Sequence, residues 1–318
     1  MKRMERAAIA VLMSLIVTGS SISAFCGPGD EGSPPAAAGE VKQAEDEGAV
    51  RFHRPYEKGD RFTLKAKLTI TFDKRIGKNQ NKQKMNFAED LIWESSVRVI
   101  GVSEAGEPVT LMARVKKAVE RVEGQDHPMS IEGGALGISA KGGQFEFNAK
   151  GQDQIHPAEV QTLQVIFGFL SGAIKPAGPS TTSDLFDPPG KVAEGETWKG
   201  DAEKIAGYVA MELAAQGIPV EADDVSCDLT FKGTETWDGL PCHRVVKRIV
   251  VTGIDIPDFT GDVELIQEDD VLLPVDAGLK KHRIQRTFHQ KIKGRIVKQG
   301  QIADIVDDTL IEGEYIFE

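Results

Sequence analysis

The sequence contains few of the residues and spacings that usually build catalytic or metal centres. Only three cysteines and six histidines occur in 318 residues, and no zinc-type or EF-hand spacing is present. The glycine patterns of nucleotide sites and the G-x-S-x-G nucleophile motif are missing as well. We therefore expect a non-enzymatic protein without a cofactor or metal. Because catalytic residues can be dispersed, a hydrolase of envelope polymers stays open, with His243 and Asp238 as the residues to test.

Positive charge is also scarce, since 38 Lys and Arg stand against 49 Asp and Glu and the formal net charge is −11. A nucleic-acid partner needs a positive field, so we expect none. A hydrophobic content of 40% and a charged content of 27% are ordinary for a water-soluble globular protein.

Long apolar runs are missing except near the start of the chain. Three basic residues within 1–6 are followed by the apolar run 7–17 and by small residues up to Ala24. The order is that of a signal peptide, and the run is too short to cross a bilayer. We expect cleavage near residue 24, a secreted or periplasmic protein and no transmembrane segment afterwards. Residues 25–50, rich in Gly, Pro, Ala and Glu, are predicted to form a disordered acidic linker.

The three cysteines carry two separate predictions. Cys26 would be a lipid-anchored residue if the segment were a lipobox, but Phe25 stands where that pattern requires a small residue. Cys227 and Cys242 fall on a predicted hairpin that turns at Asp238-Gly239, at positions too far apart for a bridge. We expect two separate buried thiols, with a disulfide as the alternative.

Apolar and polar residues alternate over most of the remaining chain, which predicts long antiparallel strands. The pattern is without error from Phe62 to Phe72. Return strands follow over 85–99 and 109–119, and further strands over 227–251 and 281–296, with a final strand near the end of the chain.

Two segments instead have helical spacing. Residues 157–174 predict a buried helix that begins at Pro157, and residues 202–216 predict a second helix that stops before Pro219. We divide the chain into a first β-meander half, 51–175, and a second half, 176–318. Similar turns at Gly106-x-Pro108 and Gly239-x-Pro241 suggest a duplication, and chance similarity between two meanders is the alternative. The expected fold is mainly β (α+β), a curved sheet packed on one or two helices.

Four aromatic residues are candidates for an apolar pocket between the sheet and the helices: Phe72, Trp93, Phe167 and Phe169. A pocket there would suit a lipid or lipoprotein carrier and a lipophilic ligand or envelope component, whereas a simple core is the competing interpretation.

Two basic stretches have competing interpretations. The first is a predicted hairpin loop within 74–84, with the candidate residues Lys74, Arg75, Lys78, Lys82 and Lys84. It is either a solvated loop or a contact for an anionic polymer or membrane surface. The second stretch, 280–298, lies between two acidic strands, and we expect cross-strand ion pairs with Arg283 opposite Asp269 and Lys293 opposite Asp307. A binding site for a polyanionic ligand is the alternative interpretation of this stretch.

Three short motifs carry a resemblance to a family: Lys58–Leu68, Glu194–Trp198 and Asp238–Pro241. Over residues 58–318 the chain resembles an uncharacterised family of secreted, β-rich bacterial proteins of unknown function. The resemblance implies an extracytoplasmic β-rich protein and assigns no catalytic or binding residue.

Overall fold

The structure is a computed structural model that describes residues 49–78, 81–141, 144–151, 154–167, 182–213, 220–256, 258–298 and 301–318. The predicted signal peptide and nearly all of the predicted linker lie outside these ranges. The strands are β1 (Arg61–Lys78), β2 (Asn81–Val102), β3 (Pro108–Val122), β4 (Gln125–Pro128), β5 (Ala135–Lys141), β6 (Gln144–Ala149), β7 (Thr197–Lys199), β8 (Val225–Trp237), β9 (Leu240–Thr252), β10 (Phe259–Pro274), β11 (His282–Lys298) and β12 (Gln301–Phe317). The helices are α2 (Pro157–Phe167), α3 (Thr182–Phe186), α4 (Ala202–Leu213) and the 3-10 turn η2 (Ala222–Asp224).

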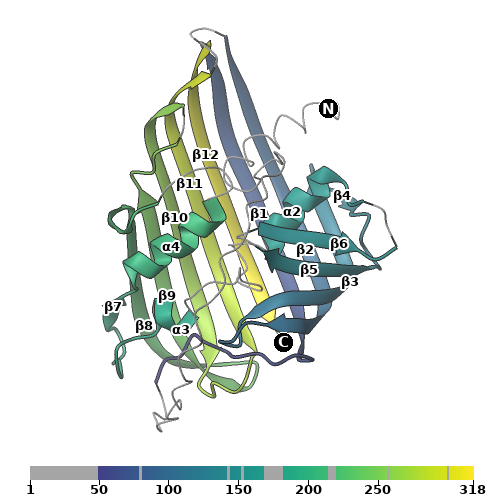
Figure 1. Ribbon diagram of the computed structural model, residues 1–318, viewed down its shortest axis with the longest axis vertical. Coiled ribbons are helices and arrows are strands. Elements are labelled where there is room, and N and C mark those ends of the chain that lie inside the picture. Colours follow the sequence, from purple (N-terminus) through teal and green to yellow (C-terminus); the bar gives the residue numbers. More distant parts are fainter. Residues whose placement is uncertain are drawn as a thin grey trace, which may run out of the picture.

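All of these strands belong to one antiparallel sheet, whose order is β6-β5-β3-β2-β1-β12-β11-β10-β9-β8-β7, with β4 paired to β3. Two meanders meet in the middle of this sheet, where β1 pairs with β12 from Leu64 opposite Phe317 to Gly77 opposite Asp304. The sheet is curved, and α2 and α4 lie on one side of it (Figure 1). The predicted mainly β fold with a curved sheet and few helices is thereby confirmed. The duplication stays a prediction.

The side of the sheet that faces the helices, called the inner face below, is set by the alternation in the sequence. On β1 every second residue from Phe62 to Phe72 is buried, and on β2 the residues Leu91, Trp93, Val97 and Val99 are buried. A one-residue slip would turn each apolar set toward water, so this pattern fixes the register. The predicted alternation of the first two strands is confirmed.

The helical region differs from the prediction in its detail. Helix α2 begins at Pro157 as predicted and is described to Phe167, and α4 begins at Ala202 and is described to Leu213. The predicted ends at residues 174 and 216 lie outside the described residues. Sequence patterns did not predict α3, which lies within the expected connector 176–194 and is too short to show a helical period. Strands β4, β5 and β6 were also not predicted.

Two facing glycines allow β10 and β11 to approach closely near one end of the sheet. Gly261 lies opposite Gly294, and a Cβ on Gly294 would lie 2.5 Å from the ring of Phe259 and 2.4 Å from the carbonyl oxygen of Thr260. No real Cβ contact is that short, so any larger residue at 294 would force the strands apart. Glycine is required at this position by close packing.

The chain segment before β1 lies against the other end of the sheet. Val50, Phe52 and Tyr56 belong to the hydrophobic core. The guanidinium of Arg54 donates to the carbonyl oxygens of Pro274, at 2.7 Å, and Asp276, at 3.1 Å. Residues before β1 are thus part of the folded protein and connect the start of β1 to the end of β10.

The two described cysteines are buried and unbridged, as expected. Cys242 lies opposite Glu235 and Cys227 opposite Ile249, on a hairpin whose turn residues Asp238 and Gly239 both have positive φ. This left-handed pair is typical of a two-residue hairpin turn. In the part of the chain that the structure describes, no helix combines the length and apolar character needed to cross a membrane.

Candidate functional site

The inner face carries a row of charged side chains in positions that the alternation assigns to the core. Lys247 of β9, Asp269 of β10 and Arg286 of β11 are direct cross-strand neighbours. Their side chains are 8%, 0% and 6% exposed, respectively. Buried charges are rare in proteins unless they are paired, so this inner-face row is the feature of the sheet that most needs an explanation.

Asp269 is the centre of the row and accepts hydrogen bonds from three side chains. Lys247 Nζ lies 2.9 Å from Asp269 Oδ2, Arg286 Nη2 lies 2.7 Å from the same oxygen, and Gln267 Nε2 donates to it at 2.8 Å. Arg286 Nε also donates to Oδ1. Burial alone would raise the pKa of the Asp269 carboxyl, but the charges and hydrogen bonds of Arg286 and Lys247 hold it well below its usual range. The carboxylate is therefore ionised at neutral pH.

The row itself holds two cations and one carboxylate. Aromatic rings contact both cations: Lys247 Nζ is 4.1 Å from the centre of the Phe186 ring of α3, and the Arg286 guanidinium is 5.9 Å from the Tyr315 ring. Such contacts stabilise a cation only modestly compared with a second anion. An anionic group beside Lys247 and Arg286 would balance the charge of the row.

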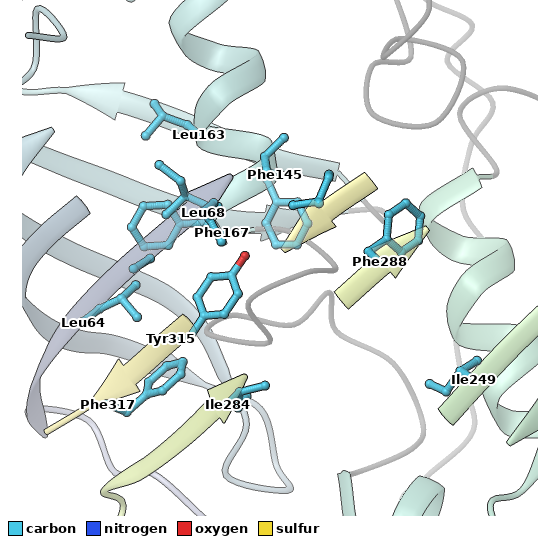
Figure 2. Close-up of a cluster of buried hydrophobic side chains, with 14 of the residues drawn as sticks. Leu64, Leu68, Phe145, Leu163, Phe167, Ile249, Ile284, Phe288, Tyr315 and Phe317 are labelled. Carbon is cyan, nitrogen blue, oxygen red and sulfur yellow. The ribbon is translucent and has the colours of Figure 1, made fainter. Parts of the chain in front are cut away.

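Two buried polar atoms beside the row have no hydrogen-bond partner in the part of the chain that the structure describes: Gln267 Oε1 and Tyr315 Oη. Gln267 is 4% exposed and Tyr315 is 0% exposed. Burial raises the pKa of Tyr315, so its hydroxyl remains a donor. Figure 2 shows this hydroxyl pointing into the group of side chains that includes Leu68, Phe145 and Phe167. An unsatisfied buried polar atom costs on the order of 1–3 kcal/mol, which a ligand that supplied the missing partner would recover.

A second, smaller polar pair lies on the same face between the two meanders. Lys74 of β1 and Asp307 of β12 are paired at 3.6 Å, with side chains 6% and 5% exposed. Thr309 donates to Asp307 at 2.6 Å. Burial lowers the pKa of Lys74 to about 8 although Asp307 partly opposes the shift. This pair contains one charge of each sign and leaves no excess.

The predicted apolar pocket residues are only partly brought together. Trp93 and Phe167 are both fully buried and meet edge to face at 5.1 Å between ring centres. Phe72 lies on the same inner face but contacts Phe87 at 5.3 Å. Phe169 lies outside the described residues. The contacts of Trp93 and Phe167 belong to the core that joins α2 to β2.

The predicted basic loop is mostly strand, because β1 continues to Lys78 and β2 begins at Asn81. Lys74 was wrongly grouped with the loop: even-numbered residues of β1 face inward, and its side chain is buried against Asp307. Arg75 and Lys84 lie opposite each other in the β1–β2 register and are exposed. The side chains of Lys78 and Lys82 lie outside the described residues.

The expected cross-strand ion pairs are present, but the register was misjudged. Asp269 lies opposite Arg286, not Arg283, and Lys293 lies opposite Val306, not Asp307. Arg283 instead donates to Glu314 at 2.6 Å on the outer face. The register of a long hairpin follows from its turn, and a shift of three residues pairs Asp269 with the buried Arg286 in place of Arg283.

No family model and no curated protein matches the chain. Among solved structures, that of P47 from Clostridium botulinum A2 is similar at 7% identity over 75% of this chain and 80% of that chain, with a TM-score of 0.15. A similarity this low supports no argument about fold or function.

The residues chosen to test a hydrolase have separate surroundings. His243 faces inward, contacts the ring of Phe231 and lies 3.4 Å from the Thr234 hydroxyl, and burial lowers its pKa. Asp238 is in the exposed β8–β9 turn and is paired with Lys281. Within the described ranges, no cluster of three or more His, Cys, Asp and Glu side chains is arranged to hold a metal ion.

Sequence reasoning missed Lys247, Gln267 and Arg286 as site residues, although a signal was present. On β10 the inward positions run Val263, Leu265, Gln267, Asp269, Val271 and Leu273. Two consecutive inward positions with polar residues, on a strand whose other inward residues are apolar, indicate a buried polar site once the register is known.

Proposed function

We propose that the protein is a non-enzymatic, extracytoplasmic binding protein whose inner face holds an amphiphilic ligand with an anionic head group. The observation that carries this proposal is the buried inner-face row beside Gln267 Oε1 and Tyr315 Oη, two buried atoms that have no hydrogen-bond partner among the described residues. A carboxylate or phosphate head group would pair with the row and accept a hydrogen bond from the Tyr315 hydroxyl, and a hydroxyl group of the ligand would donate to Gln267 Oε1.

The surroundings of the row favour a ligand with an apolar body. Across the sheet, the register continues from Arg286 to Gly313 of β12 and Leu68 of β1. The inward positions two residues before and after the row on β9 to β12 are mostly apolar: Ile249, Phe288 and Ile311 on one side and Val245, Val271 and Ile284 on the other. Transfer of an acyl chain from water to an apolar surface is favourable by roughly 0.8 kcal/mol for each buried methylene, so this face would bind acyl chains. The ring of Phe186 covers Lys247, and a ligand that reaches this ammonium group must displace that ring.

The extracytoplasmic location is proposed from the sequence, in which a basic start, an apolar run and small residues precede Ala24 in signal-peptide order. A partner-binding or structural role without a small ligand is the competing proposal within the same class. The envelope-polymer hydrolase receives no support from His243 and Asp238, whose contacts differ as described above.

Replacement of the whole row tests the proposal without leaving a buried charge unpaired. The variant Lys247→Met, Asp269→Leu, Arg286→Met, called the apolar-row variant below, removes all three charges. Its matched control is Lys74→Met with Asp307→Leu, which removes the balanced pair on the same face. Each variant and the wild type are titrated with a fluorescent long-chain fatty acid, and native mass spectrometry records any small molecule that co-purifies.

We expect the wild type and the control to bind the fatty acid and the apolar-row variant to bind it at least tenfold more weakly. A wild-type protein that binds neither the fatty acid nor an anionic phospholipid would overturn the proposal in favour of the partner-binding role. Equal affinity of the apolar-row variant would overturn the assignment of the head group to the row.

A further inference from the structure

The end of the sheet where the β1–β2 and β11–β12 hairpins turn has a charge opposite to that of the whole chain. Residues 73–84 and 295–304 contain seven Lys or Arg and two Asp, whereas the formal net charge of the chain is −11. The two hairpins are adjacent because β1 pairs with β12, with Gly77 opposite Asp304 at this end. Two basic stretches that are distant in the sequence thus lie together, at the strand ends drawn at the top of Figure 1.

Three of the cations at this end, Arg75, Lys84 and Arg295, point to the outer face of the sheet, whereas Lys74 is buried on the inner face. Inward residues of β1 are even-numbered and those of β2 near its start are odd-numbered, so Arg75 and Lys84 face outward, directly opposite each other. On β11 the inward residues are even-numbered, so Arg295 faces outward as well. Their side chains are 51%, 56% and 61% exposed.

The same outer face exposes two large apolar side chains at its extreme end. Val297 of β11 and Ile302 of β12 are direct cross-strand partners and are 43% and 41% exposed. Both positions follow the outward parity, and nothing in the fold requires apolar residues there. The set Arg75, Lys84, Arg295, Val297 and Ile302 is called the tip face below.

We infer that the tip face docks the protein on a lipid bilayer that contains anionic phospholipid. The cations supply electrostatic attraction to the anionic lipid head groups. Val297 and Ile302 enter the boundary between head groups and acyl chains, where each apolar side chain adds stabilisation in proportion to the area it buries. A soluble polyanion would use the cations but would gain nothing from the apolar pair, so the apolar pair favours the bilayer.

Acidic neighbours weaken the attraction but do not reverse it. Asp73 pairs with Arg75 at 3.0 Å and with Lys84 at 4.0 Å, and Asp304 pairs with Arg295 at 3.4 Å. Exposed ion pairs are worth little, so these cations can exchange a carboxylate for a lipid phosphate at small cost. The inference is independent of the proposed inner-face ligand, since it uses the outer face alone.

The test measures binding to sedimenting vesicles of phosphatidylglycerol and phosphatidylcholine, against vesicles of phosphatidylcholine alone, at low and high salt. The charge variant is Arg75→Glu, Lys84→Glu, Arg295→Glu. Its matched control is Lys116→Glu, Lys199→Glu, Arg248→Glu, which makes the same change of charge at exposed, ion-paired residues elsewhere on the sheet. Circular dichroism confirms that each variant keeps its strand content.

We expect the wild type to prefer anionic vesicles, the charge variant to lose at least tenfold in partition coefficient and the control to lose less than threefold. Equal binding of the wild type to both vesicle types, or equal losses in the charge variant and the control, would overturn the inference.

The variant Val297→Ser, Ile302→Ser separates a bilayer from a soluble polyanion. It should bind anionic vesicles several-fold more weakly while retaining wild-type affinity for heparin. If it bound vesicles as the wild type does, the tip face would be a polyanion site and the bilayer assignment would be wrong.

Discussion

Adjacent residues of the same strands form ion pairs on opposite faces of the sheet, in very different surroundings. On the outer face Arg248 of β9 donates to Glu268 of β10 at 2.8 Å, with side chains 48% and 53% exposed. One residue earlier and later along the same strands, Lys247 and Asp269 form a pair that is almost completely buried. The difference teaches that ion pairs of similar length have different energetic consequences: loss of a partner costs little on the exposed face, whereas on the buried face it leaves a charge without compensation.

The largest difference in stability between the two faces is expected from a substitution of Asp269. Replacement of Asp269 by Asn leaves two buried cations without their counter-ion, and we expect a loss of about 3–5 kcal/mol in the free energy of unfolding. The control Glu268→Gln, one residue away on the outer face, should cost less than about 1 kcal/mol. Urea unfolding at pH 7 measures both, and similar losses in the two variants would contradict the account.

A comparison of the wild type with Asp269→Asn also predicts how stability depends on pH. Because the folded-state pKa of Asp269 is lowered, the unfolded state binds more protons below about pH 4, the ordinary Asp value. The contribution of Asp269 is therefore complete above that pH and declines as the pH falls below it. The difference in stability between the wild type and Asp269→Asn should shrink on acidification.

Removal of all three charges of the row should change the free energy of unfolding in the opposite direction to removal of Asp269 alone. In the apolar-row variant no charge is left without a partner, and the desolvation cost of three ions disappears. We expect the free energy of unfolding to be unchanged or to rise by up to about 4 kcal/mol, as measured by urea unfolding. A loss as large as that of Asp269→Asn would show that the row is required for the fold itself.

His282, the first residue of β11, should make a smaller contribution to stability that depends on pH. Its ring stacks on Phe317 at 4.0 Å, and burial lowers its pKa to about 4 although a hydrogen bond to the Lys280 carbonyl opposes the shift. The unfolded state takes up a proton near pH 6.5 and the folded state does not, so stability should fall by about 2–3 kcal/mol between pH 7 and pH 4.5.

Thermal or urea unfolding at the two pH values tests this expectation in His282→Phe, which should lose most of that dependence. The control is His127→Phe on β4, where the side chain is exposed, and it should keep the wild-type dependence. Identical pH profiles for the wild type and His282→Phe would show that another group causes the fall.

The smallest effect is expected on the outer face. Arg283 and Glu314 lie 2.6 Å apart between β11 and β12 and are partly exposed. Arg283→Gln should cost less than about 1 kcal/mol, and 0.5 M NaCl should reduce that cost further because salt screens exposed charges. A cost above about 2 kcal/mol, unaffected by salt, would show that outer-face pairs stabilise the sheet as the buried row does.

Local patterns in the sequence predicted what depends on neighbours along the chain. The alternation from Phe62 to Phe72, the start of α2 at Pro157 and the turn at Asp238-Gly239 were all predicted correctly, because backbone periodicity and turn chemistry act over a few residues. The pairing of β1 with β12 was not predicted, because it joins residues more than 220 positions apart, Gly77 and Asp304 among them.

The candidate site depended on this missing register. Asp269 was predicted to lie opposite Arg283, and the shift of three residues to Arg286 concealed the buried row. Lys74 was assigned to a loop because its neighbours are basic, whereas its inward parity and Asp307 on the distant β12 determine its burial. The aromatic residues Trp93 and Phe167 are in contact, as expected for a shared apolar region. The polar residues Gln267 and Asp269 at inward positions of β10 were the stronger indication of a site.

The most direct test of the proposed inner-face ligand is the nuclear magnetic resonance of the row during a titration with palmitate. In ¹⁵N-labelled protein, the Arg286 Nε–H and Gln267 side-chain amide signals report on the atoms that would contact the head group. The account predicts that both signals shift and that the shifts saturate at one equivalent of palmitate. Signals that stay unchanged at saturating palmitate would contradict it.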